Sequence, residues 1–166
     1  MGTTQERYSR RGVSRFYFLK AIAAPNNVPT RAELGTTNGT DLSAFISDVE
    51  GFALENTAID TPDMASSFTS NIPGENKADN SSFTFYEDKG SDTLEALLSQ
   101  GVEGFVVILR KGDIQLTPAS RSMEVFPVRV GSRSATYTAA NEPAKFKVSF
   151  NITSEPAQDL AVPAAS

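Results

Sequence analysis

Residues 144–154 read "AKFKVSFNITS" and show the clearest alternation of apolar and polar side chains in the chain. Four apolar side chains alternate with four polar ones: Phe146, Val148, Phe150 and Ile152 against Lys145, Lys147, Ser149 and Asn151. Because successive side chains of a strand point to opposite faces, this pattern predicts a strand with one face in the core. A strand buried on one face only is typical of an antiparallel sheet.

Other strand-like segments lie before it in the chain. The apolar run from Phe105 to Leu109 is short and rich in β-branched residues, which favours a strand buried on both faces over a helix. Within "SMEVFPVRVGS", Pro127 indicates a sheet edge or a bulge. The remaining predicted strands cover residues 15–22, residues 42–59 with a break near Gly51, a weak piece at 66–72, and residues 81–89.

Two segments carry helix signals. Thr30 and Glu33 have the spacing of a capping box, which predicts a single helical turn there. Residues 92–100 are the stronger candidate, with Asp92 as the expected N-cap and leucines at helical spacing. Residues 36–41 are turn-like.

About seven strands and one clear helix predict a mainly β fold. We expect two packed antiparallel sheets, sandwich-like or barrel-like, with one flanking α-helix near residues 92–100. Polar, aperiodic residues 1–13 predict an N-terminal arm, and residues 158–166 a Pro/Ala-rich C-terminal tail. The predicted domain spans residues 14–157 and includes a long loop at residues 60–82, "DTPDMASSFTSNIPGENKADNSS". A compact domain rarely carries so long a structureless connection without a use for it.

The composition excludes several kinds of chemistry. The chain has no histidine and no cysteine, so it can form no Ser-His-Asp triad, no Cys-His dyad and no His-ligated zinc site. No acidic stretch has the spacing of a calcium-binding loop, and we predict no catalytic residue, metal or cofactor. No apolar run is long enough for a membrane helix, and the N-terminus lacks the apolar block of a signal peptide.

Charge is unevenly distributed along the chain. Residues 1–33 hold six basic and two acidic side chains, whereas residues 60–95 hold eight acidic and two basic ones. A nucleic-acid-binding domain normally shows a basic face over its whole surface, so we expect an arm that docks on a protein neighbour. Its candidate contact residues are Arg7, Arg10, Arg11 and Arg15. The alternative is a solvated surface with a random charge distribution.

Three segments together resemble the major tail tube protein of long-tailed bacteriophages. They are "RFYFLKAIAAPNNVPTRAEL", "ISDVEGFALENTAIDTPDMASSFTSNIPGENKADNSSFTFYED" and "MEVFPVRVGSRSATYT…AKFKVSFNITSEPA", which cover about residues 14–157. The resemblance implies two packed antiparallel sheets with a flanking helix, and no enzymatic activity. It also implies a virion protein, made in the host cytoplasm, that forms hexameric rings stacked into a hollow tail tube.

The resemblance further implies partners and surfaces. The partners would be other copies of the chain, the tape-measure protein and the tail-tip or terminator proteins, with DNA passing only transiently through the lumen. A lining that lets DNA slide should be acidic or neutral. The candidate lumen-facing acidic residues are Asp48, Glu50, Glu55, Glu87 and Asp88, whose alternative is an outward, solvated face. From the long loop, we expect Asp63, Phe68 and Ile72 to contact another subunit or ring; a mobile hairpin tip is the alternative.

Two further functions remain open from the residues alone. A β-sandwich module that binds carbohydrate or a cell-surface protein could decorate a virion. An enzyme that uses carboxylates is the weakest hypothesis, with Asp60, Asp63 and Asp79 as its candidates.

Overall fold

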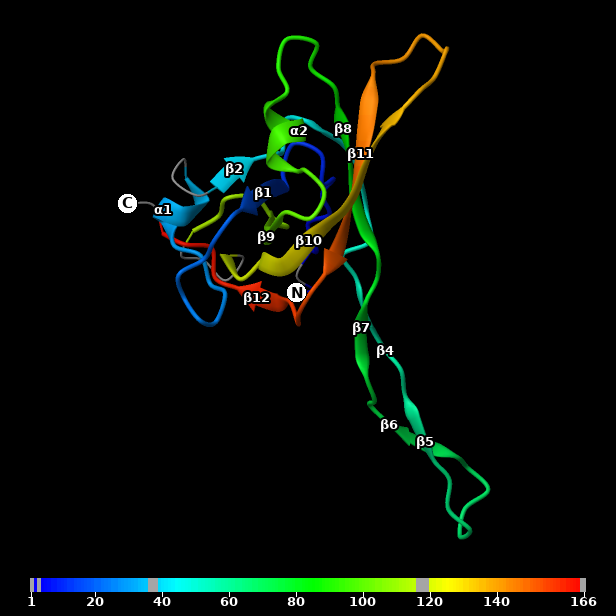
Figure 1. Cartoon of the computed structure of the whole chain (residues 1–166). Helices are drawn as coiled ribbons and strands as arrows, with labels where there is room; N and C mark the ends of the chain where they lie inside the picture. Colours follow the sequence, from blue (N-terminus) through cyan, green and yellow to red (C-terminus); the bar gives the residue numbers. More distant parts are fainter. Residues whose placement is uncertain (1, 3, 36–38, 116–119, 165–166) are drawn as a thin grey trace.

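The computed structural model describes residues 2, 4–35, 39–115 and 120–164 (Figure 1). The described residues form twelve strands and two short helices. The helices are α1 (Arg31–Leu34) and α2 (Thr93–Leu97). The strands are β1 (Arg15–Leu19), β2 (Gly39–Asp41), β3 (Ile46–Glu50), β4 (Leu54–Asn56), β5 (Ile59–Thr61), β6 (Ser70–Ile72), β7 (Asn76–Ala78), β8 (Ser81–Tyr86), β9 (Glu103–Leu109), β10 (Met123–Thr136), β11 (Lys145–Ile152) and β12 (Ala157–Leu160).

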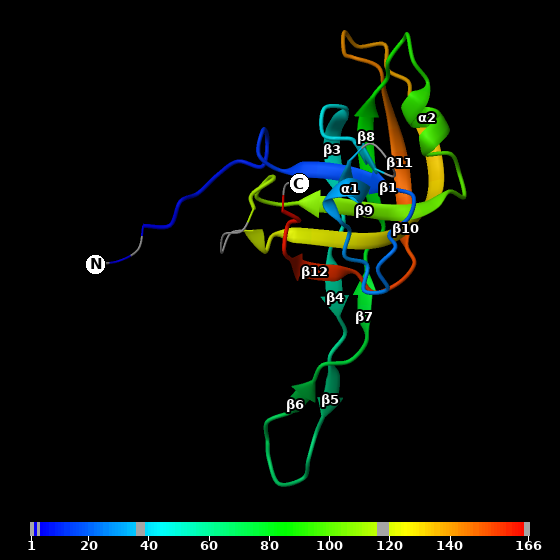
Figure 2. The ribbon, with the colours of Figure 1, turned by 90° about the vertical axis from the view of Figure 1, so that its left-hand side faces the viewer.

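One antiparallel sheet with the order β2-β1-β9-β10-β11-β8-β3 forms the body, and β12 pairs with β10 beside this path. The long strand β10 belongs to two layers. Its first part pairs with β9, its second part pairs with β11, and a bulge between Val130 and Ser132 interrupts the second ladder. Figure 2 shows β9 and the first part of β10 running across the view, with β8 and β11 running nearly at right angles to them. The expected two antiparallel layers are therefore halves of one bent sheet, which does not close into a barrel.

The two halves enclose an aromatic core. Phe83, Phe126 and Phe150 are fully or almost fully buried, and Phe52 contacts all three rings at centroid distances of 5.0, 5.2 and 6.3 Å. Such ring pairs add about 0.5–1.5 kcal/mol each beyond the burial of their area. Leu94 of α2 packs into the same core. The predicted helix is thus present and covers part of this core.

A second, smaller apolar cluster lies on the other face of β1, β9 and β10. Val107 and Leu109 of β9 join it, whereas Val106 and Ile108 belong to the aromatic core. The prediction that this strand is buried on both faces is therefore confirmed. Leu34 of α1 and Val162 near the C-terminus cover the second cluster.

Strand β11 confirms the alternation that indicated the fold. Phe146, Val148 and Phe150 are buried, whereas Lys147 and Asn151 are exposed. The expectation for Pro127 was wrong, because β10 lies inside the sheet and Pro127 pairs with Phe105 of β9. The N–H and C=O groups of one strand residue point to the same side, and the Pro127 carbonyl accepts from the Thr153 amide at 3.0 Å. The missing N–H therefore faces the junction between β11 and β12 and not the β9 ladder.

The two helix starts differ from each other. At α1 the predicted capping box is present: the Thr30 side chain accepts from the Glu33 amide, and the Glu33 carboxylate accepts from the Thr30 amide. At α2, Asp92 occupies the N-cap position as predicted, but its side chain makes no capping hydrogen bond. Residues Gly39–Asp41, expected as part of a turn, pair with β1 as a strand.

Residues 60–82 are not a structureless loop. They belong to a long hairpin in which β4 pairs with β7 and β5 pairs with β6, and the hairpin projects well beyond the body (Figure 1). It begins at the predicted break, where Gly51 has a φ of +80° and a Cβ there would lie 2.6 Å from the Asn80 carbonyl. Asn56 holds its two ladders together, because its side chain donates to the Gly74 carbonyl at 3.0 Å and accepts from the Gly74 amide at 3.2 Å.

The two ends of the chain are arranged differently. The N-terminal arm extends away from the body (Figure 2). The C-terminal segment lies on the body, because Ala157–Leu160 form β12 and Val162 is 3% exposed. Ordered structure therefore continues past residue 157, where the sequence placed the end of the domain.

Candidate assembly surfaces

The acidic residues considered for catalysis do not converge. Asp60 lies on β5, the Asp63 carboxylate accepts from the Ala65 amide in the hairpin tip, and Asp79 follows β7. Among the described residues, no three acidic side chains are grouped so that they could hold a metal ion. No helix in the described part of the chain is long and apolar enough to cross a membrane.

The distal end of the hairpin is apolar and unusually exposed. Ile59 and Ile72 pair directly across the β5–β6 ladder, yet they are 53% and 51% exposed. In the tip, Met64 is fully exposed and Phe68 is 75% exposed. We call Ile59, Met64, Phe68 and Ile72 the hairpin patch. A cluster of exposed apolar side chains marks an interaction surface, so this end of the hairpin fits a contact with another molecule.

The outer face of β3, β8 and β11 is polar and nearly balanced in charge. Asp48 and Glu50 of β3 lie on it, and the Lys147 ammonium of β11 contacts the Glu50 carboxylate at 3.1 Å. The register places hydroxyl side chains beside them: Ser82, Thr84 and Ser149 on β8 and β11, and Ser132 and Ser134 on the neighbouring β10. We call this surface the polar sheet face.

The five acidic residues expected to line a lumen do not form one row. Asp48 and Glu50 lie on the polar sheet face. Glu55 lies on the hairpin, directly opposite Lys77, and Glu87 and Asp88 follow the far end of β8. Sequence reasoning missed the lysines of β11 as part of this surface. Their outward position was predicted, but nothing local indicated that β3 would lie two strands away.

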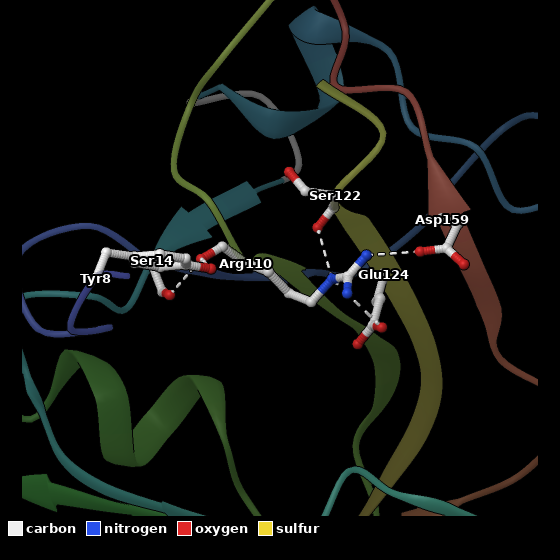
Figure 3. Close-up of polar contacts among 6 residues, drawn as sticks. All are labelled: Tyr8, Ser14, Arg110, Ser122, Glu124 and Asp159. Carbon is white, nitrogen blue, oxygen red and sulfur yellow. Dashed lines mark hydrogen bonds and ion pairs between the residues drawn. The ribbon is translucent and has the colours of Figure 1, made fainter. Parts of the chain in front are cut away.

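Arg110, just after β9, joins both ends of the chain to the body (Figure 3). Its backbone carbonyl accepts from the Ser14 hydroxyl at 2.6 Å and from the Tyr8 hydroxyl at 3.2 Å. Its guanidinium donates to the Asp159 carboxylate of β12 at 2.6 Å and lies 3.6 Å from the Glu124 carboxylate of β10. One side chain and its carbonyl thus connect the arm, the central strand and the C-terminal strand.

The electrostatics of this cluster depend on burial. Burial raises the pKa of Glu124, and the Arg110 guanidinium opposes that rise. At a second junction, Arg31 makes a two-bond contact with Asp113 at 2.7 and 2.9 Å, which lowers the pKa of the Asp113 carboxyl. Neither pair could be found by sequence patterns, because the partners lie far apart in the chain.

A groove lies between the arm and β3. The arm contributes Arg10, Arg11 and Ser14 to its wall, and Phe16, Ile46 and Phe52 are among its apolar lining residues. Its free volume is about 710 Å³. Of the basic arm residues expected to make contacts, Arg10 and Arg11 line the groove, Arg7 lies farther out, and Arg15 begins β1.

Comparison with known proteins gives the family. The family model described as "Phage tail tube protein" matches residues 1–165. The chain belongs to the phage tail tube protein family. A tail tube protein is a structural component of the virion tail and not an enzyme, so the carboxylate-based catalytic hypothesis is rejected.

Several solved structures share this fold at low sequence identity. A sheath/tube terminator of the PVC extracellular contractile injection system has a TM-score of 0.57 at 11% identity, covering 93% of this chain and 98% of that one. The tube-terminating cap of the anti-feeding prophage gives 0.55 at 11% identity, with 90% and 89% covered. The tail of an empty GTA particle, computed with C6 symmetry, gives 0.52 at 8% identity, with 92% and 98% covered. No curated protein matches.

Proposed function

We propose that this tail tube protein assembles into hexameric rings, and that the rings stack into the hollow tube through which DNA passes. The observation that carries the proposal is the projecting hairpin, whose apolar end has no partner among the described residues of its own chain. A body with an exposed apolar extension at one end is built for contacts with a neighbour. The C6 symmetry of the GTA tail supports six subunits to a ring.

The polar sheet face is the surface that best fits the lumen. Its two acidic side chains, Asp48 and Glu50, are offset by Lys145 and Lys147 on the same face, and hydroxyl groups occupy the rest. A strongly basic lining would hold the phosphate backbone, whereas a neutral one does not. DNA would therefore pass this surface without binding to it.

The other contacts follow from the same assembly. The basic arm residues Arg7, Arg10, Arg11 and Arg15 contact acidic residues of an adjacent subunit, and the hairpin reaches a neighbouring subunit or ring. The tube ends meet tail-tip and terminator proteins, in line with the terminator and cap among the similar structures. The tape-measure protein occupies the lumen before DNA does. The protein is made in the host cytoplasm before it enters the virion.

Negative-stain electron microscopy of the purified protein over a range of concentrations tests the proposal. We expect rings or tubes of uniform diameter, with six-fold averages in end views. Protein that stays monomeric at every concentration, including in mixtures with tail-tip proteins, would refute it. Rings with another symmetry would still support a tube, but they would change the proposed number of subunits per ring.

A further inference from the structure

The described residues hold two surfaces that lack a partner, and they lie on different parts of the molecule. Four of the eight large hydrophobic side chains that are exposed belong to the hairpin patch. The hairpin points away from the body, so no described part of the same chain lies against its end (Figure 1). Whatever covers this patch must come from another molecule.

The groove beside the arm is a concave surface that could receive the hairpin patch. It is concave and open to solvent, and it is lined by apolar side chains such as Phe16 and Ile108. Tyr86 also contributes to its lining. Its free volume of about 710 Å³ lies in the range of ligand-binding clefts, which is large enough for several side chains. A projecting pair of side chains such as Met64 and Phe68 can enter such a groove.

The charges of the two surfaces are also complementary. Arg10, Arg11 and Arg110 line the groove together with Asp48 and Glu124, so the lining carries one more positive than negative charge. Arg10 and Arg11 form no ion pair at contact distance within the described part of the chain, although Arg10 attracts Glu124 electrostatically. The distal hairpin, residues 57–74, contains Asp60 and Asp63 and no basic residue. Two cations without a contact partner therefore stand beside a groove of net positive charge, and two carboxylates flank the patch that could fill it.

We propose that the hairpin patch of one copy docks in the groove of another copy. In this contact Met64 and Phe68 lie on the apolar lining, and Asp60 and Asp63 face Arg10 and Arg11. The inference rests on the proposed tube function and names the acceptor of the hairpin. Because the two surfaces differ, the contact is heterologous, and each copy can offer its hairpin to one neighbour and its groove to the next. Repetition of this contact builds a directional polymer.

Cross-linking between two single-cysteine variants tests the docking directly, since the natural chain has no cysteine. One variant carries Ala65→Cys in the hairpin tip, which leaves Met64 and Phe68 in place. The other carries Ser47→Cys, at a groove-lining position. A short bis-maleimide cross-linker added to tubes assembled from a mixture of the two should give a covalent dimer that contains both variants.

The matched control is Ala139→Cys, an exposed alanine in the loop between β10 and β11 at the opposite end of the molecule from the hairpin (Figure 1). Mixed with Ser47→Cys, it should give at least tenfold less cross-linked dimer. Tubes in which Ala65→Cys and Ser47→Cys cross-link no better than this control would overturn the proposal.

Charge reversal supplies a second, independent test. Arg10→Glu/Arg11→Glu alone, and Asp60→Arg/Asp63→Arg alone, should each raise the concentration needed for tube formation by about fivefold or more, most strongly at low salt. The chain that carries all four changes should assemble like the natural protein, because each reversed arm then meets a reversed hairpin. Failure of the combined variant to recover would count against this pairing.

These outcomes separate the inference from the proposed function. Normal tubes without the hairpin-to-groove cross-link would refute only the docking, and the proposed tube function would be unaffected. A specific cross-link in soluble oligomers that never form tubes supports the docking and argues against the tube. Protein that neither assembles nor cross-links contradicts both.

Discussion

Replacing Arg110 by alanine should destabilise the unassembled subunit by about 1–3 kcal/mol at pH 7. Loss of the pair with the largely exposed Asp159 accounts for about 0–1 kcal/mol. The larger part comes from Glu124, whose side chain is only 17% exposed and would lose its nearest cation. Leaving a largely buried charged group without its partner costs about 1–3 kcal/mol, and we take the lower half because the Arg110–Glu124 distance is 3.6 Å.

The deficit should depend on pH with a defined sign. Burial raises the folded-state pKa of Glu124, and removing Arg110 should raise it further. A carboxyl with a raised pKa destabilises the folded protein when ionised, so the penalty is present at pH 7 and disappears as pH falls below the ordinary pKa of glutamate. The double variant Arg110→Ala/Glu124→Gln should recover most of the loss at pH 7.

Thermal unfolding followed by circular dichroism, at a concentration where light scattering shows monomer, measures both effects. For a chain of this size, about 1–3 kcal/mol corresponds to a fall in Tm of about 2–12 °C. The control is Arg129→Ala, whose ion pair with Glu103 at 3.7 Å is exposed on both sides and should cost less than about 0.5 kcal/mol. An Arg110→Ala deficit equal to that of the control, or unchanged between pH 7 and pH 4, would refute the reasoning.

Three further changes probe the body of the fold. Thr30→Ala removes the side-chain half of the capping box and should cost about 1 kcal/mol in urea unfolding; an unchanged midpoint would show that the α1 cap adds nothing. Phe83→Ala opens a cavity in the aromatic core and should cost about 3–5 kcal/mol, or prevent folding, whereas Phe83→Leu should cost less; equal losses would contradict the account of the core. Backbone amides of Thr30 and Ala23 lower the pKa of Glu33, so its stabilisation is present above the ordinary pKa of glutamate and is lost as pH falls through the lowered one. Glu33→Gln should therefore flatten the decline of stability toward acid pH, and an unaltered acid limb would argue against that role.

Sequence patterns predicted the parts of the fold that depend on local periodicity. The alternation in β11 and the short apolar run in β9 reflect burial along a single strand, and the Thr30–Glu33 box is complete within one turn. Strands such as β2 and β12 are short and carry several polar residues. They form because the neighbouring strands β1 and β10 have backbone groups available for pairing. Pro127 was misplaced because its effect depends on which strand its amide side faces.

The candidate surfaces also combine features that local sequence patterns indicated with features that they did not. The exposure of Phe68 and Ile72 agrees with the expectation that the segment at 60–82 makes outside contacts, although the contact itself stays a prediction. A hairpin tip was only the alternative for this segment, and the strands β5 and β7 were not predicted, because the paired segments are three residues long and mostly polar. The Arg110 cluster and the groove combine residues from the arm, β3, β9 and β10, and no local pattern links such distant positions.

The hairpin also determines how the body would respond to a mechanical load. β7 leads into β8 after only two residues, and β4 follows β3 across the Gly51 break, so the hairpin continues the line of two core strands (Figure 1). Tension on its end pulls β3 and β8 together along their length, perpendicular to the ladder hydrogen bonds that join β8 to β11. The bonds are then loaded together in shear and not one after another as in peeling. In a tube held together by such hairpins, stretching would have to break all the hydrogen bonds of a strand pair at once.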